Sequence, residues 1–474
     1  MDTGKRNLRT KLCYGAGYLP DPCFYQFIAS FQIVFLTGVV GLSPAVAGTI
    51  SSVTIMSDAI FSIVVGKWSD NVRSRFGRRR PFLLAVYLLM PLSFAMMFRT
   101  AGGGDTFRFW YYMLWGFVFW IAYAAFFVCY VALGADVATD YEDRILLNSY
   151  TRLFTLGGGI LGTAVPLTAI AALTSRGMET ENAWFLFAAA LAALVLLGGF
   201  LCWNATRGLE QPVWDEPESQ GIAGFFHDCR QLLTLRPYRK VIFSKVFSNV
   251  AYTFYTGTLI FYMQFVLQID TRFSAVIYLL SNVVSLVLVP FIAKMTFKLG
   301  KRKYMAYAQF VCAGLSLLMG LVGVRSRALL VLYMLIYIYG QASFWQLCNT
   351  NLYDITDLDE YRFGVRREGN IMALQSFINT GFTSVSLKVL TGLLAASGFS
   401  ATAAVQTSGA IMMLKTLFIW VPAGAALLSG LFLFAYRVDK DNFVLLKEAL
   451  YRRHHDMENL SEEETARIED MFRS

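Results

Sequence analysis

Charged residues are scarce in this 474-residue chain, where Asp, Glu, Lys and Arg together make up 15% of the sequence. Soluble domains typically carry about 25% charged residues, so the shortage argues against an ordinary soluble protein. Histidine is rarer still, with three residues that lie in polar segments at positions 227, 454 and 455. This placement excludes a histidine base or a histidine-bound metal within an apolar segment.

Cysteine pairs and enzyme motifs are also missing. The 7 cysteines include no CxxC pair and suggest small buried hydrophobic residues rather than a disulfide framework. No H-E-x-x-H, G-x-S-x-G or P-loop sequence is present, so we predict no enzyme, no catalytic residue, no metal and no cofactor. The polar, basic start and the long first apolar block do not fit a cleavable signal peptide.

Hydrophobic residues are abundant, at 56% of the chain, and they come in blocks of about twenty residues. Such a block crosses a hydrocarbon core of about 30 Å as one helix. The sequence therefore predicts an all-α membrane protein with twelve transmembrane helices. They are expected at 12–40, 45–69, 81–99, 109–136, 150–173, 183–204, 240–267, 273–297, 303–323, 328–352, 369–396 and 412–436.

Basic residues predict how these helices are oriented. Most Lys and Arg residues outside the apolar blocks lie in the N-terminal segment, in alternate loops and in the C-terminal tail. The positive-inside rule then places both termini in the cytoplasm of a cell membrane, the inner or plasma membrane. The basic residues behind the net charge of +9 lie in these loops between apolar blocks, which fits membrane topology better than nucleic-acid binding. We therefore expect the lipid bilayer as a partner and no nucleic acid. We also expect a monomer.

The chain divides into four segments. Residues 1–204 form an N-terminal six-helix half, 205–239 a cytoplasmic central loop, 240–436 a C-terminal six-helix half and 437–474 a cytoplasmic tail, expected as a solvated helix. The basic loop at 75–80 is echoed at 298–303, and the acidic motif at 136–140 is echoed at 354–357. Two parallel six-helix halves with a solute site at the midplane are the organisation of the major facilitator fold.

Several motifs match a known family more specifically. Lys11-Leu12-Cys13-Tyr14-Gly15 opens the first helix, and a basic run at 73–81 follows the second. The segments 354–357 and 364–369 join helices 10 and 11. Together they resemble the glycoside–pentoside–hexuronide:cation symporter family, which includes melibiose permease. The resemblance implies secondary active symport of a sugar or glycoside by alternating access, driven by a Na⁺ or H⁺ gradient.

Two carboxylates are expected near the middle of the membrane. At about 1.5 Å per residue, Asp21 lies about 15 Å and Asp58 about 18 Å from the cytoplasmic ends of their helices. Charged groups at such depth are costly and are functional candidates by default. The alternative role for Asp58 is that of a structural acid, and the alternative for Asp21 is to satisfy amides freed by Pro20 and Pro22.

The resemblance places an acid at the position of Asp58 in the cation site. The second acid of melibiose permeases is Ser62 here, and Phe61 replaces an asparagine. One carboxylate with a hydroxyl suits a proton better than Na⁺, because burial raises the proton affinity of a carboxylate. The candidate coupling residues are Asp58, Ser62 and Asp21, and H⁺ is favoured over Na⁺ as the coupling ion.

The resemblance also indicates sugar contacts. Arg152, Trp345, Gln375 and Ser376 match substrate positions of the family. Aromatic faces bind the apolar faces of sugar rings, which adds Trp120 and Tyr123 in helix 4 as weaker candidates. Asp21 is a further candidate sugar contact. The alternative role for Arg152 is an ion pair with an acidic residue, and the alternative for Trp120 is that of an ordinary core residue.

Charged cytoplasmic loop residues are candidates for a gate. Ion pairs there can close the cytoplasmic side of the carrier and break again during transport. The alternative is that these charges serve only as topology determinants. The predicted pairs join Asp70 to Arg78, Arg79 and Arg80, and Asp136 and Asp140 to Arg144.

Two other functions stay open from the sequence. A carrier of the same fold could move another amphiphile such as a lysolipid, and several substituted site positions leave room for this. A transport-dead membrane sensor would share every feature above, and a flux assay separates it from a symporter.

Overall fold

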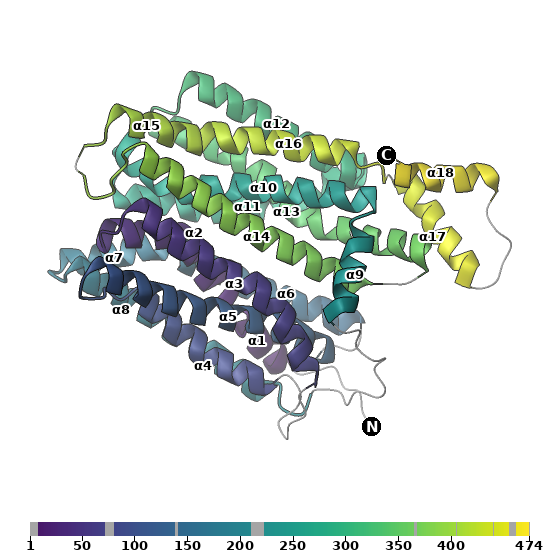
Figure 1. Ribbon diagram of the computed structural model, residues 1–474, viewed down its shortest axis with the longest axis horizontal. Helices are drawn as coiled ribbons and strands as arrows, with labels where there is room; N and C mark the ends of the chain where they lie inside the picture. Colours follow the sequence, from purple (N-terminus) through teal and green to yellow (C-terminus); the bar gives the residue numbers. More distant parts are fainter. Residues whose placement is uncertain are drawn as a thin grey trace. The chain divides into compact units, whose positions relative to one another are not determined.

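The computed structural model describes residues 8–71, 80–137, 141–209, 222–364, 367–403, 405–438, 440–454 and 461–473, and every regular element in these ranges is a helix (Figure 1). The first part of the chain forms α1 (Leu8–Ala16), η1 (Asp21–Tyr25), α2 (Gln26–Val34), η2 (Phe35–Val39), α3 (Pro44–Asn71), α4 (Arg80–Met97), α5 (Asp105–Val137), α6 (Tyr141–Thr163), α7 (Val165–Ser175) and α8 (Thr180–Ala205). The rest forms α9 (Ile222–Leu232), α10 (Arg236–Phe261), η3 (Tyr262–Val266), α11 (Thr271–Leu299), α12 (Lys301–Val322), α13 (Arg327–Phe363), α14 (Glu368–Ala396), α15 (Ser408–Lys415), η4 (Thr416–Trp420), α16 (Val421–Ala435), α17 (Lys440–His454) and α18 (Glu462–Arg473).

Eleven helical runs within the described residues are long and apolar enough to cross a membrane. They correspond to eleven of the twelve predicted spans. The remaining prediction, 240–267, is also helical as α10 and η3. Its buried residues include Ser244, Ser248, Asn249, Thr253 and Thr258, so its buried side is partly polar. The predicted all-α membrane fold is confirmed, and the segment of α10 and η3 is the predicted span that is not among the eleven apolar runs.

The first spanning run is interrupted where two prolines remove backbone donors. Pro20 and Pro22 flank Asp21, and the chain widens there into the π-helical segment η1. The amide of Asp21 donates to Tyr18 O, and the amide of Cys23 donates to Leu19 O. A π-helical turn of this kind often marks a functional site, because it changes the direction of the side chains that follow.

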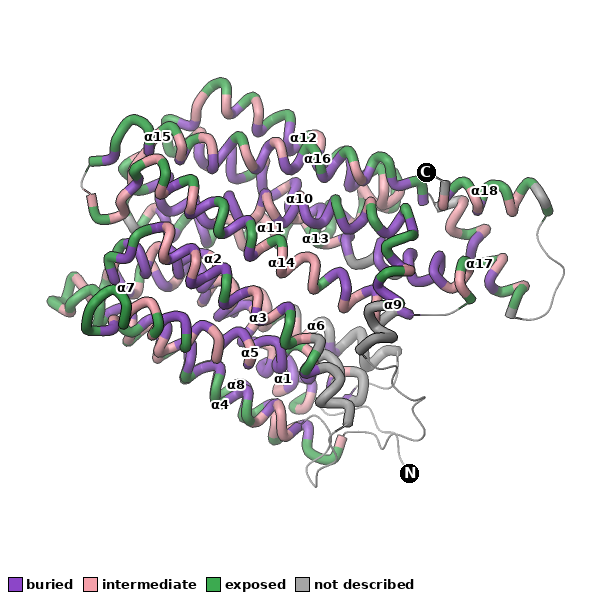
Figure 2. The backbone as a smooth tube through the Cα atoms, viewed as in Figure 1, coloured by how far each residue is buried: buried purple, intermediate pink, exposed green. Residues whose placement is uncertain are grey.

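The chain separates into two compact units. Unit 1 comprises 1–214, 256–282 and 383–414, and unit 2 comprises 215–255, 283–382 and 415–474. In unit 1, α3 packs against α5, α4 packs against α5 and α8, and α1 packs against α6 and α8. Buried residues line the inner faces of these helices, and exposed residues alternate with them along α4 and α8 (Figure 2). The four segments predicted from the sequence stay a prediction.

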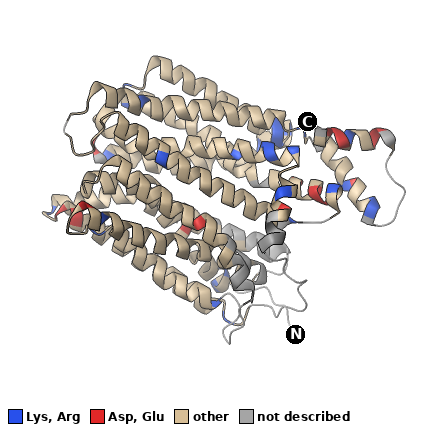
Figure 3. Cartoon of the chain, viewed as in Figure 1, with Lys and Arg blue, Asp and Glu red and all other residues tan. Residues whose placement is uncertain are grey.

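Unit 2 ends in two helices that pack onto the bundle. In it, α12 packs against α13 and α16, and α17 packs against α13 and α18. Charged residues collect along α17 and α18, whereas the long helices are largely uncharged (Figure 3). Nevertheless, Leu446, Leu450, Ile468 and Met471 of these helices are buried. The tail is therefore not a solvated helix: the apolar residues of α17 and α18 are buried by the packing of α17 against α13 and α18.

Candidate functional site

Asp21 is held by tyrosine hydroxyls in unit 1. Tyr123 of α5 donates a hydrogen bond to Asp21 Oδ1 at 2.5 Å, and the Tyr18 hydroxyl also contacts this carboxylate. The Tyr123 ring stacks on Tyr25, with ring centroids 6.0 Å apart. The carboxylate thus faces α5 with hydroxyl partners, and not only the amides freed by the neighbouring prolines. The π-helical turn brings together Asp21 and Tyr123, two of the predicted site residues.

Trp120 lies one helical turn before Tyr123 on the same helix. Its ring packs edge-on against Tyr25, at 6.0 Å between centroids, and its side chain is 2% exposed. Its indole Nε1 is buried and has no hydrogen-bond partner among the described residues. A buried donor without a partner is costly, so this group is available to a ligand that supplies an acceptor. Asp21, Tyr123 and Trp120 therefore combine acceptors, donors and aromatic faces.

Asp58 lies on α3, half-buried and within electrostatic reach of the Tyr123 hydroxyl. The Ser62 hydroxyl, one turn later, is 3.5 Å from Asp58 Oδ1, the outer limit of a hydrogen bond. Thr54, one turn earlier, donates its hydroxyl to Ile50 O at 2.8 Å. Helix α3 thus offers one carboxylate with one distant hydroxyl beside it.

A second cluster lies in unit 2, between α10 and α13. The Trp345 indole Nε1 donates to Gln341 Oε1 at 3.0 Å. Gln341 in turn accepts a hydrogen bond from the Ser248 hydroxyl at 3.3 Å. The Trp345 side chain is 36% exposed, so part of its ring is free to meet a solute. Of the other predicted contacts in unit 2, Gln375 is buried on α14 and Ser376 is exposed.

The sequence reasoning missed Lys245. The Lys245 ammonium lies over the face of the Trp345 ring, 5.4 Å from its centroid. The signal was available, because a single lysine inside the polar, otherwise uncharged stretch of a predicted spanning helix is unusual.

The beginning of α3 is sealed against the end of α14 within unit 1. Ser384 donates to Ser52 O at 2.6 Å, and Lys388 contacts both Thr49 Oγ1 and Ala45 O. A Cβ at Gly48 would lie 1.7 Å from Thr391 Oγ1, so only glycine allows this approach. These contacts join helices from the two predicted halves at one end of the bundle.

Several predicted residues cannot be placed. Arg78, Arg79 and Asp140 lie outside the described residues, and the side chains of Asp70, Asp136, Arg144 and Arg152 lie outside the described part as well. Arg80 is buried, donates to Trp203 O at 2.7 Å and lies over the Trp203 ring. This contact ties the start of α4 to the end of α8. The predicted gate pairs and the role of Arg152 stay predictions.

Three acidic side chains at the end of α13 are each paired with a cation from another segment. Asp354 pairs with Lys301 of α12, and Asp357 pairs with Lys447 of α17 at 2.7 Å. Burial raises the pKa of Asp354 to about 6, although Lys301 opposes the shift. The motif at 354–357, noticed in the sequence, thus organises ionic contacts within unit 2.

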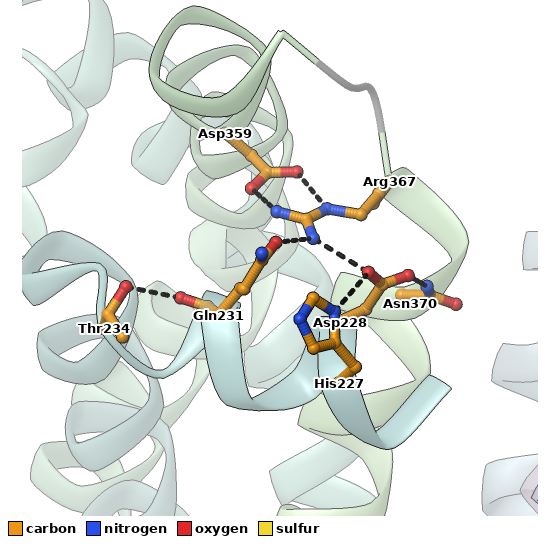
Figure 4. A network of polar contacts seen from close by, with 7 residues as sticks. All are labelled: His227, Asp228, Gln231, Thr234, Asp359, Arg367 and Asn370. Carbon is orange, nitrogen blue, oxygen red and sulfur yellow. Dashed lines mark hydrogen bonds and ion pairs between the residues drawn. The ribbon is translucent and has the colours of Figure 1, made fainter. Parts of the chain in front are cut away.

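The third acid, Asp359, belongs to a buried network (Figure 4). Arg367 donates to both oxygens of Asp359, at 2.7 and 3.0 Å, and to Asp228 Oδ1 at 2.9 Å. The same guanidinium reaches Gln231 Oε1 at 2.6 Å, and Asn370 donates to Asp228 Oδ2 at 2.7 Å. Arg367 therefore anchors α9, which lies in the predicted central loop, to the junction of α13 and α14.

We expect Arg367→Ala to lower the free energy of unfolding by about 3–5 kcal/mol, because it leaves the buried Asp359 carboxylate without its cation. Thermal melting of the purified protein in detergent measures this loss. Arg362→Ala is the matched control, since Arg362 makes a half-exposed pair with Glu469 and should cost less than about 1 kcal/mol. Equal melting temperatures for the two variants would show that the network does not stabilise unit 2.

Comparison with known proteins bears on what these clusters do. A family model described as MFS/sugar transport protein matches residues 13–440. The isoprimeverose transporter of Lactiplantibacillus pentosus is 22% identical over 423 residues, which cover 88% of this chain and 86% of that protein. The glucuronide carrier protein homolog of Escherichia coli (strain K12) is 25% identical over 456 residues, 92% of this chain and 93% of that protein.

The fold is similar to that of solved structures. The crystal structure of a D-xylose–proton symporter matches with a TM-score of 0.64 and 14% identity, over 91% of this chain and 98% of that chain. At this identity the likeness bears on the fold alone.

Proposed function

The chain belongs to the MFS/sugar transport protein family, and we propose that it carries a sugar or glycoside across the membrane in symport with a cation. The observation that carries the proposal is the pairing of Asp21 with Tyr123 beside the unpartnered indole N–H of Trp120. Sugar hydroxyls supply both acceptors and donors, and the sugar ring supplies an apolar face for the aromatic side chains. The family membership agrees with the resemblance in the sequence motifs, and the chain is a transporter rather than an enzyme.

Transport proceeds by alternating access in this proposal. The contacts of Gly48, Ser52 and Thr49 with α14 form the closed outer end, with both chain termini in the cytoplasm. Release of these contacts opens the path to the outside, and ion pairs at the cytoplasmic ends then close the inside. The protein acts as a monomer in the cell membrane.

The coupling ion in this proposal is the proton. Na⁺ needs several oxygen ligands and compensating charge, whereas a proton needs one carboxylate. The Ser62 hydroxyl is at the limit of hydrogen-bond distance from Asp58. The Thr54 hydroxyl donates a hydrogen bond to the backbone of its own helix. The Asp58 carboxylate can therefore act as the proton carrier.

Uptake in proteoliposomes tests both parts of the proposal. Labelled glycosides are offered while Na⁺ and H⁺ gradients are imposed separately at fixed membrane potential. We expect uptake to follow the pH gradient, to collapse with a protonophore and to ignore Na⁺. Uptake that rises with Na⁺ and ignores the pH gradient refutes the proton, and no uptake of any glycoside under either gradient refutes the symporter.

We expect Trp120→Phe to weaken glycoside binding about tenfold, because phenylalanine keeps an aromatic face but removes the donor that a sugar hydroxyl would satisfy. A hydrogen bond of this kind contributes about 1–1.5 kcal/mol. Equilibrium binding of the transported glycoside measures the effect. Trp110→Phe, on the exposed start of the same helix, is the control that should bind normally. Unchanged affinity in Trp120→Phe would remove the indole from the site.

A further inference from the structure

Asp21 is a carboxylate that pairs with no cation among the residues that the structure describes. Its partners are the hydroxyls of Tyr123 and Tyr18, which donate hydrogen bonds but carry no charge. The residue lies inside the first spanning run, Leu8–Val39. A charge at such a place is costly unless an opposite charge compensates it. A ligand that brings a positive charge would supply this compensation.

Aromatic side chains are gathered at the same carboxylate. The Tyr25 ring stacks on Tyr123, and the Trp120 ring lies edge-on to both, with centroids 6.0 Å from Tyr25 and 5.4 Å from Tyr123. Tyr18 and Tyr25 are only half-buried, so part of each side chain is open to a solute. The face of an aromatic ring carries partial negative charge and attracts a cation, and groups of such rings recognise ammonium ligands.

Two further groups narrow the chemistry of the ligand. Asp58, within electrostatic reach of the Tyr123 hydroxyl, adds negative charge to the site in its ionised form. The buried Trp120 indole N–H lacks an acceptor within the described part of the chain, so it suits an oxygen of the ligand. A fitting ligand therefore combines a positive charge with hydroxyl groups. A protonated amino sugar has both, whereas a neutral sugar lacks the charge and an anionic one is repelled.

We propose that Asp21 binds a protonated amine of the transported solute, so that the preferred substrates are glycosides of an amino sugar. This inference rests on the proposed symport of a glycoside, and it names the chemical class of substrate for that same site. The ammonium donates hydrogen bonds to the Asp21 carboxylate and lies against the Tyr25 ring. A hydroxyl of the sugar accepts a hydrogen bond from the Trp120 indole.

Matched sets of p-nitrophenyl glycosides test the inference on the full-length protein in proteoliposomes. One set is the β-glucosaminide, its N-acetyl derivative and the β-glucoside, and the other is the corresponding galactoside set. Within a set the members differ in an ammonium, a neutral amide or a hydroxyl at one carbon. At a pH that keeps the amine protonated, we expect the wild-type protein to bind the amine of at least one set about tenfold or more tightly than both neutral members.

Three variants assign this preference to one carboxylate. Asp21→Asn can still accept a hydrogen bond from Tyr123 but carries no charge, so the ratio of the affinities for amine and neutral members should fall to about one. Asp21→Glu keeps the charge and should keep a preference for the amine. Asp105→Asn is the matched control, because it removes an exposed carboxylate at the start of α5, the helix of Tyr123, and should keep the wild-type ratio.

The possible results separate this inference from the proposed function. Equal or weaker binding of the amine by the wild-type protein, or an unchanged ratio in Asp21→Asn, overturns the inference and leaves glycoside symport standing. Binding of the neutral glucoside that requires Na⁺ in the wild-type protein but not in Asp21→Asn also overturns it, since the carboxylate would then hold an inorganic cation. Uptake of no member of either set overturns both.

Discussion

Asp58→Asn is expected to abolish accumulation of substrate against a gradient while downhill flux persists. Asp58 is the half-buried carboxylate of α3 near the Tyr123 hydroxyl, and the Ser62 hydroxyl lies 3.5 Å from its Oδ1. Asparagine keeps the size of the side chain but cannot take up and release a proton. The accumulation ratio should therefore fall to equality across the membrane, measured as steady-state uptake in energised vesicles.

The control for this variant is Asp105→Asn. Asp105 is exposed in the first turn of α5, and its neutralisation should leave accumulation unchanged. Counterflow with preloaded substrate separates loss of coupling from loss of transport, because exchange needs binding and reorientation but no net driving force. Normal accumulation by Asp58→Asn would exclude Asp58 from the coupling mechanism.

Gly48→Ala is expected to stop transport although it adds a single methyl group. The added carbon would lie 1.7 Å from Thr391 Oγ1 and 2.5 Å from Thr391 Cβ, where α3 meets α14. Overpacking of a close contact typically costs about 1–3 kcal/mol, and this cost falls on the closed outer end alone. The carrier then favours the state in which this end is open, and initial uptake rates should fall at least tenfold.

Two companion variants test the cause of that loss. Gly392→Ala lies next to Thr391 on α14, where an added Cβ meets nothing within 4 Å, and it should transport normally. Combining Gly48→Ala with Thr391→Gly removes the clashing side chain and should restore uptake. Failure of this rescue, with both proteins present in the membrane, would mean that the α3–α14 contact does not limit the transport cycle.

Much of the fold could be predicted because it depends on local pattern. Apolar blocks of membrane length gave the spanning helices, and Pro20 and Pro22 indicated the break around Asp21. Asp21 and Tyr123 were each named as candidates, but their hydrogen bond joins residues about one hundred positions apart and was not predicted. Side-chain contacts between distant segments have no such pattern.

The network around Arg367 and the cation at Lys245 show why the rest could not be predicted. Arg367 joins Asp359 to Asp228, which lies far away in the chain in a segment expected to be a loop. Nothing in the spacing of these residues indicates that they meet. Lys245 could have been noticed as a lysine within a predicted spanning helix, but its contact with the Trp345 ring joins residues 100 positions apart.

The ionic contacts at the end of α13 also set an order in which the protein is completed during synthesis. Asp354 can pair with Lys301 as soon as α13 has been made, and Asp359 gains Arg367 within a few further residues. Asp357 pairs with Lys447 of α17, which lies 90 residues further along the chain and is made later. In a chain that lacks α17, Asp357 loses this cation, and we expect such a truncated copy to be less stable and more readily degraded than the complete one.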